Sequence, residues 1–166
     1  MAQREKTPKT VEVLTASVLC ARRSVIAAKR RRRKLAKPFY VNCGAACCNG
    51  VGALASASDS LGKRSAIVAC TGPIEAEYLA LLMAMMDIEE CELPGPIEFR
   101  LARPAVADLD TATSPEMAEL RRRVVDHLAR NPGWELELVG QRHNWIADAP
   151  ARRTLSRWLI LNVHLV

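Results

Sequence analysis

Aromatic residues are scarce in this chain of 166 residues, which contains three Trp, two Tyr and two Phe. Since hydrophobic residues of all kinds still make up 49% of the sequence, a mainly aliphatic core is expected. Trp134 and Trp158 occupy positions typical of a core strand and of the inner face of a helix. Trp145 fits either the core or a surface on which a nucleic-acid base can stack.

Long apolar runs are also missing. No stretch reaches the roughly 18 apolar residues that a membrane-spanning helix needs, and the charged N-terminus lacks the apolar segment of a secretory signal. These absences predict an intracellular protein without a membrane partner. The six cysteines are then expected to be reduced, and the spacing of Cys43, Cys47 and Cys48 does not match a zinc site.

Charge is unevenly distributed along the chain. Residues 1–37 contain 12 Lys or Arg and 2 Asp or Glu, a balance of +10. Residues 38–166 contain 12 Lys or Arg and 16 Asp or Glu, a balance of −4. This asymmetry predicts a basic arm over residues 1–37 and a mildly acidic folded domain over residues 38–166, with the arm reaching a polyanionic partner.

The arm has the pattern of a helix that ends in a run of cations. Thr7 and Pro8 form a typical helix start. The apolar positions that then share one helical face are Val11, Leu14, Val18 and Val25. The six adjacent cations that follow are Lys29, Arg30, Arg31, Arg32, Arg33 and Lys34. Like charges this close repel unless phosphates neutralise them, so either a solvated tail or a nucleic-acid contact explains the run.

The rest of the chain predicts an α/β domain. Strands are expected at 39–46, 51–57, 65–70, 97–101 and 134–139, and helices at 74–89, 103–109, 115–130 and 147–161. Asn49-Gly50 is typical of a hairpin turn, and Ser114-Pro115 of a helix start. Three strands, a helix, a strand, two helices, a strand and a helix indicate a mixed sheet.

Glu77 stands out because it lies at the start of a helix that is almost wholly apolar from Tyr78 to Met86. A carboxylate is costly to bury unless it binds something. Glu77 is therefore either a metal ligand or phosphate-site residue, or a charge that interacts favourably with the helix dipole.

Five segments, taken in order, resemble the ribonuclease H family and in particular its archaeal-type branch, over roughly Phe39 to Leu159. They are residues 39–42, 75–81, 97–100, 115–121 and 139–149. The resemblance implies a ribonuclease H-like five-stranded mixed sheet flanked by helices, here with the N-terminal basic helical arm in addition. It also implies four carboxylates that hold two Mg²⁺ ions, which activate a water to cut the RNA strand of an RNA–DNA hybrid.

Two of the four implied ligand positions lack a carboxylate. Glu77 and Asp148 match the family's catalytic glutamate and last aspartate, whereas Asn42 stands at the first aspartate and Ala102 at the third. Because Mg²⁺ requires hard oxygen ligands, Glu77 and Asp148 are expected to hold no metal or one weakly bound Mg²⁺. His143 matches a mobile histidine that helps product release in some members, or is an ordinary loop residue.

Three functions are compatible with this pattern. The first is a ribonuclease H-like protein with lost or strongly impaired metal-dependent hydrolysis, which binds RNA, DNA or hybrid largely through its basic arm. The second is an active hybrid ribonuclease with an unusual metal site. The third is a structural subunit of a ribonucleoprotein or protein assembly. The missing carboxylates favour a protein that is not an enzyme.

Overall fold

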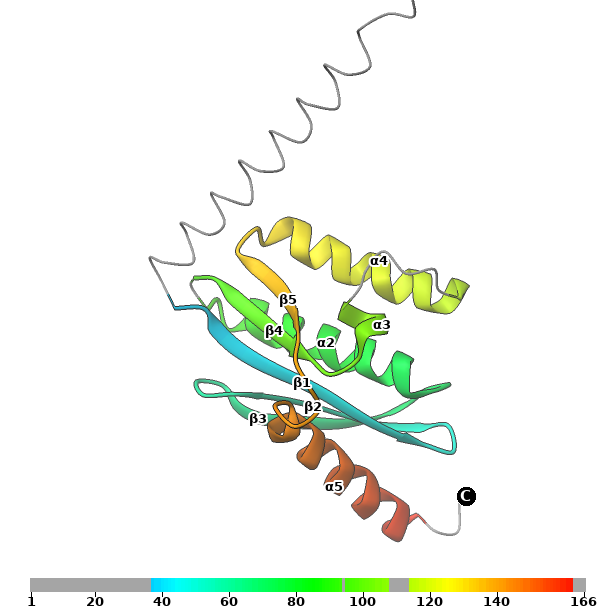
Figure 1. Cartoon of the computed structure of the whole chain (residues 1–166). Helices are drawn as coiled ribbons and strands as arrows, with labels where there is room; N and C mark the ends of the chain where they lie inside the picture. The colour runs from blue at the N-terminus through cyan, green and yellow to red at the C-terminus, as the bar shows by residue number, and fades with distance from the viewer. Residues whose placement is uncertain (1–36, 94, 108–113, 163–166) are drawn as a thin grey trace, which may run out of the picture. The chain divides into compact units, whose positions relative to one another are not determined.

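The computed structural model describes residues 37–93, 95–107 and 114–162 of the chain (Figure 1). Its elements are β1 (Phe39–Cys48), β2 (Val51–Ser58), β3 (Gly62–Ala69), α2 (Pro73–Glu90), β4 (Ile97–Leu101), α3 (Pro104–Ala107), α4 (Pro115–Arg130), β5 (Trp134–Leu138) and α5 (Trp145–Leu161). Their order confirms the sequence-based prediction. The predicted arm helix and its six cations lie outside the described residues, so the arm and its boundary with the domain stay predictions.

The five strands form one mixed sheet with the spatial order β3-β2-β1-β4-β5. β1 and β2 pair antiparallel, as do β2 and β3, whereas β4 runs parallel to both β1 and β5. The first hairpin turns at Asn49 and Gly50, which both have positive φ angles of 50° and 77°. These are the left-handed conformations that an Asn-Gly turn supplies at little steric cost.

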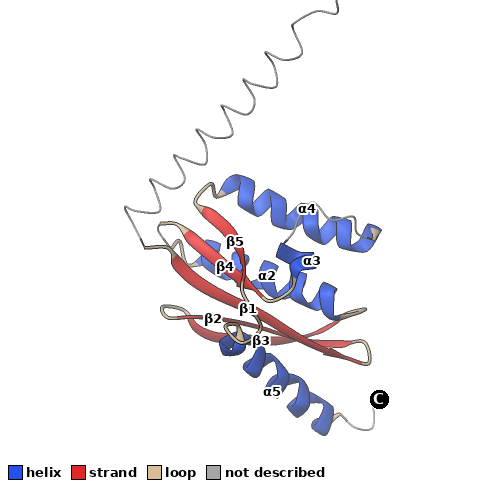
Figure 2. Ribbon diagram, in the orientation of Figure 1, coloured by secondary structure: helices blue, strands red, loops and turns tan. Residues whose placement is uncertain are grey.

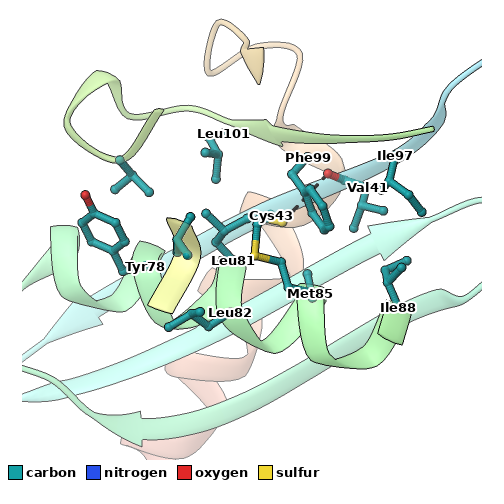
Figure 3. Packing of buried hydrophobic residues seen from close by; sticks show 13 residues of the cluster. Val41, Cys43, Tyr78, Leu81, Leu82, Met85, Ile88, Ile97, Phe99 and Leu101 are labelled. Atoms are coloured by element: carbon teal, nitrogen blue, oxygen red, sulfur yellow. Dashed lines mark hydrogen bonds between the residues drawn. The ribbon is translucent and has the colours of Figure 1, made fainter. Parts of the chain in front are cut away.

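One face of the sheet carries the main core, under α2 and α4 (Figure 2). Alternate residues of β1 and β4, such as Val41, Cys43 and Phe99, meet the apolar side of α2 at Tyr78 and Leu81 (Figure 3). The Trp134 ring packs edge-on against Phe99, with centroids 5.2 Å apart. Burying aliphatic surface of this extent is the main stabilising contribution to the fold.

The C-terminal ends of α2 and α4 are joined by polar contacts. Nδ1 of the buried His127 lies 2.9 Å from Oε1 of Glu89, and the Asn131 amide donates to the same oxygen at 3.0 Å. Burial acts to raise the pKa of Glu89, but these partners and Arg130 outweigh it and lower the pKa. The hydrogen-bonding capacity of His127 Nδ1 is therefore used in the packing of α4 against α2.

The opposite face of the sheet is covered by α5, which packs on β1, β2 and β3 (Figure 2). The residues of α5 that meet the sheet are small or aliphatic: Ala147, Ala151 and Leu155 are buried. Gly44 of β1 permits the closest approach, because a Cβ atom there would lie only 2.9 Å from the backbone N of Asp148. Both faces of the central strands are consequently buried. No helix among the described residues is long and apolar enough to span a membrane.

Candidate functional site

Glu77 lies in the second turn of α2 and is only 2% exposed. The helix begins after Gly72 with Pro73 in its first turn, where a missing N–H costs nothing. Glu75 serves this helix start, because its Oε2 accepts hydrogen bonds from both N and Oγ1 of Thr71 at 2.6 Å. Glu77 instead points to the end of β4. The prediction that Glu77 lies near the start of a helix, beside the sheet, is confirmed.

Both carboxylate oxygens of Glu77 are engaged by donors from the β4–α3 connection. Oε1 accepts hydrogen bonds from the backbone N–H groups of Ala102 and Arg103, each at 3.1 Å. Oε2 forms an ion pair with Nε of Arg103 at 2.8 Å. Burial raises the pKa of Glu77 above its usual range, although the Arg103 and Ala102 donors oppose that rise. The buried carboxylate thus links α2 to the end of β4 through hydrogen bonds and an ion pair.

Ala102 directly follows β4, at the position that the sequence analysis assigned to the third aspartate. Its backbone N–H contacts Glu77, but its methyl side chain offers no ligand atom. The next residue, Arg103, brings a cation where the resemblance implies an anion. The ion pair between Arg103 and Glu77 was not foreseen, because it depends on how the chain turns after β4.

Asn42 lies on the face of β1 opposite to Val41 and Cys43. Val41 and Cys43 face the core under α2, so the alternation of β1 turns Asn42 toward the α5 face, as it does Gly44. The Asn42 amide donates to the carbonyl oxygen of Ala57 on β2, at 3.5 Å. Asn42 thus lies on the face of β1 from which Asp148 approaches Gly44, and its place at the lost aspartate position stays a prediction.

Cys43 is the β1 side chain on the same face as Glu77. Its thiol is completely buried. Burial is the main cause that raises the pKa of this thiol, and the nearby Glu77 carboxylate raises it further. A protonated thiol is a poor ligand for Mg²⁺. The alternation of side chains along β1 indicated that Cys43 and Asn42 lie on opposite faces of the sheet. Because both faces of β1 are apolar, the sequence did not show which of the two residues faces α2.

Asp148 approaches the same region from the other face of the sheet, in the first turn of α5. Burial raises its pKa, while Arg152, Arg103 and Asn144 oppose the rise. Asp148 in turn contributes to the raised pKa of Glu77, so the two carboxylates act on each other electrostatically. The structure brings these two predicted residues within electrostatic reach of each other, with Arg103 acting on both.

Asn144 is another residue that the sequence analysis did not single out. It is completely buried, and its Nδ2 donates to the Cys43 carbonyl oxygen at 2.7 Å and to Asp148 Oδ1 at 3.3 Å. Its Oδ1 has no hydrogen-bond partner among the described residues. Asn144 therefore ties the start of α5 to β1 and orients Asp148. Its spacing of four residues from Asp148 was an available signal.

His143 and Trp145 flank Asn144 but face outward. His143 is exposed in the loop before α5, where its backbone N–H donates to Gly140 O at 2.7 Å. The Trp145 side chain is exposed, with 62% of its surface accessible. Of the two readings given for Trp145, the surface position is the correct one. The role of His143 stays a prediction.

The donors present do not match a site for two Mg²⁺ ions. No cluster of three or more His, Cys, Asp or Glu suited to a metal occurs in the part of the chain that the structure describes. Glu77 has both oxygens engaged, Cys43 is a thiol, and the guanidinium of Arg103 supplies positive charge beside both carboxylates. A two-metal site needs several hard anionic ligands held around the ions.

Comparison with known proteins identifies the fold. No protein-family model and no curated protein matches the chain in sequence. Among solved structures, it is similar to ribonuclease H1 from the halophilic archaeon Halobacterium salinarum, with a TM-score of 0.60 and 20% identity over 72% of this chain and 98% of that one. The chain has the ribonuclease H fold.

Two further structures support this fold. A ribonuclease H1 isolated from compost by a metagenomic approach matches with a TM-score of 0.60 and 18% identity, over 73% of this chain and 96% of that one. The N-terminal ribonuclease H domain of a Mycobacterium tuberculosis protein matches with a TM-score of 0.56 and 11% identity, over 66% of this chain and 92% of that one. The resemblance inferred from the five sequence segments is thereby confirmed at the level of fold.

Proposed function

We propose that this chain is a ribonuclease H-like protein that binds nucleic acid and has lost, or strongly reduced, metal-dependent hydrolysis. The observation that carries the proposal is the ion pair between Arg103 and the buried Glu77, at 2.8 Å. A carboxylate held by a guanidinium and two backbone N–H groups is not available to a metal ion. The domain keeps the scaffold of a ribonuclease H site without its ligand set.

The loss of hydrolysis follows from the chemistry of the remaining groups. Two-metal hydrolysis stabilises the attacking and the leaving oxygen together, and the metals supply several kcal/mol of charge stabilisation in the transition state. Here Cys43 and Ala102 occupy the places where β1 and β4 approach Glu77. Asp148, with its pKa raised by burial, is left as one available carboxylate. At most one weakly bound Mg²⁺ is compatible with this set.

Nucleic-acid binding is assigned largely to the arm, on the basis of charge. Residues 1–37 carry a balance of +10, and their densest part is the run Lys29 to Lys34. Phosphate contacts by such a segment release counterions and make binding strongly salt-dependent. RNA, DNA and RNA–DNA hybrid are all suitable ligands, because contacts to phosphate do not read the base sequence.

A cleavage assay tests the catalytic half of the proposal. A labelled RNA–DNA hybrid is incubated with the unaltered chain in Mg²⁺ or Mn²⁺, with an active ribonuclease H as positive control. We expect cleavage no faster than that of a Glu77→Gln variant. Metal-dependent turnover well above that variant would contradict the proposal and favour an active ribonuclease with an unusual metal site.

A binding titration tests the other half. The unaltered chain and a variant with Lys29 to Lys34 replaced by alanine are titrated with single-stranded, duplex and hybrid probes at several salt concentrations. We expect log K to fall by about 0.9 per duplex phosphate neutralised, and the slope to flatten in the variant. An unaltered chain that binds none of the probes would refute the proposal and favour the role of a structural subunit.

A further inference from the structure

A groove of about 650 Å³ lies between β3 and α5, on the side of the domain away from α2. The cationic residues that line it are Lys63, Arg152, Arg153 and Arg157. Hydroxyl groups of Thr154 and Ser156 add further hydrogen-bonding capacity. No carboxylate is among the residues that line this groove. It is a concentration of positive charge on a domain whose own balance is −4.

The cations of this groove differ from those elsewhere in the described part of the domain. Many arginines outside the groove pair with carboxylates: Arg64 with Asp87, Arg100 with Glu98, Arg103 with Glu77, Arg122 with Glu119 and Asp126, and Arg130 with Glu89. No ion pair with a described residue is formed by Lys63, Arg153 or Arg157, and all three are exposed. Their mutual repulsion is relieved when an anion binds.

The groove is anchored by the packing of α5 on the sheet. Oγ1 of Thr154 donates to Oγ of Ser65 on β3 at 3.2 Å, and the buried Leu155 fixes the face of α5 that meets the sheet. Arg153 and Arg157 are four residues apart and so lie about 6 Å apart along the helix axis, on the same side of α5. Arg153 and Arg157 therefore form a short row along α5, and Lys63 of β3 lines the same groove.

We propose that this groove binds the sugar–phosphate backbone of a nucleic-acid strand. Exposed cations along an open groove suit an anion that repeats along a strand. Arg152, one turn after Asp148 on α5, links the groove to the candidate site electrostatically. The proposal rests on the proposed function for its class of ligand, but the residues that carry it belong to the domain and not to the arm.

The test combines groove and arm variants in the full chain. The groove variant is Lys63→Ala with Arg153→Ala and Arg157→Ala, and the arm variant replaces Lys29 to Lys34 by alanine. The matched control removes three cations from α4, by Arg121→Ala, Arg122→Ala and Arg123→Ala. Each is titrated with single-stranded, duplex and hybrid probes over a range of salt concentrations, and thermal unfolding verifies that each variant folds.

We expect the groove variant to bind at least about tenfold more weakly than the α4 control and to lose about 2 to 3 units of slope in log K against log salt. The conservative variant Lys63→Arg with Arg153→Lys and Arg157→Lys should keep most of the affinity. A loss of slope no greater than that of the α4 control would overturn the groove proposal, whatever the arm variant does. If only the groove variant loses affinity, the groove stands and the assignment to the arm is wrong. If the unaltered chain binds no probe, both proposals are wrong.

Discussion

The guanidinium of Arg103 and the carboxylate of Glu77 form an ion pair of 2.8 Å in which the Glu77 side chain is 3% exposed and that of Arg103 is 38% exposed. The pair spans two elements, because Glu77 belongs to α2 and Arg103 follows β4. Its effect, together with two backbone hydrogen bonds, is to hold the Glu77 carboxylate at the end of β4.

Removing Arg103 should destabilise the domain. In Arg103→Ala, Glu77 keeps its two backbone donors but loses the one cation that pairs with it among the described residues, so the free energy of unfolding should fall by about 1.5–3 kcal/mol, the range for a hydrogen bond to a charged group. Urea denaturation measures the change. Arg122→Ala is the matched control and should have little effect, because its partners Glu119 and Asp126 are exposed. Equal effects of the two substitutions would argue against a stabilising ion pair between Arg103 and Glu77.

Restoring carboxylates should restore a metal site only on the correct face of β1. In an Arg103→Ala background, Cys43→Asp with Ala102→Asp places two carboxylates next to Glu77, whereas Asn42→Asp with Ala102→Asp places one of them on the α5 face. We expect Mg²⁺ to raise the melting temperature of the first variant and not of the second, because a ligand stabilises the state that binds it. Calorimetric titration with Mg²⁺ gives the affinities directly. Tighter binding by the Asn42→Asp variant would show that the face was assigned wrongly.

Gly44 should not tolerate a side chain. The Cβ of an alanine would lie 2.5 Å from Asp148 Oδ1 and 2.9 Å from the Asp148 backbone N, so α5 has to move as a whole. Overpacking of this kind typically costs about 1–3 kcal/mol, and the shift should also weaken the bond from Asn144 to Cys43 O. Gly72→Ala, where no atom lies within 4 Å of the added Cβ, is the control. Unfolding curves of the two variants should differ clearly, and coincident curves would contradict this packing.

The stability of the domain should depend on pH through Asp148. Its pKa is raised above its ordinary value of 3.8 by burial, so the folded state binds more protons than the unfolded state just above that value. Stability then falls as pH rises through this range. Asp148→Asn removes the cost of the buried charge, so its stability relative to the unaltered chain should increase from about pH 3 to neutral pH. Denaturation of both proteins in the presence of a chelator measures the difference, and a difference that decreases with pH would contradict the prediction.

The secondary structure and the fold could be predicted from the sequence because local signals determine them. The Asn49-Gly50 turn, the Ser114 cap and the apolar helix after Pro73 each depend on neighbouring residues, and all three occur as expected. The five strands and their order with the helices limit the topology to a mixed sheet, and the order of the motifs indicated the ribonuclease H fold. The position of Glu77 at the sheet also followed from its place in the helix.

The composition of the site was decided by tertiary structure. The sheet is covered on both faces, so the alternation of β1 did not show in the sequence that Cys43, not Asn42, faces Glu77. The Arg103 ion pair joins residues 26 positions apart, and the bond from Asn144 to Cys43 joins residues 101 positions apart. The groove combines Lys63 with residues near position 155. Contacts at such separations depend on how helices pack on the sheet, and local sequence patterns carry no information about that packing.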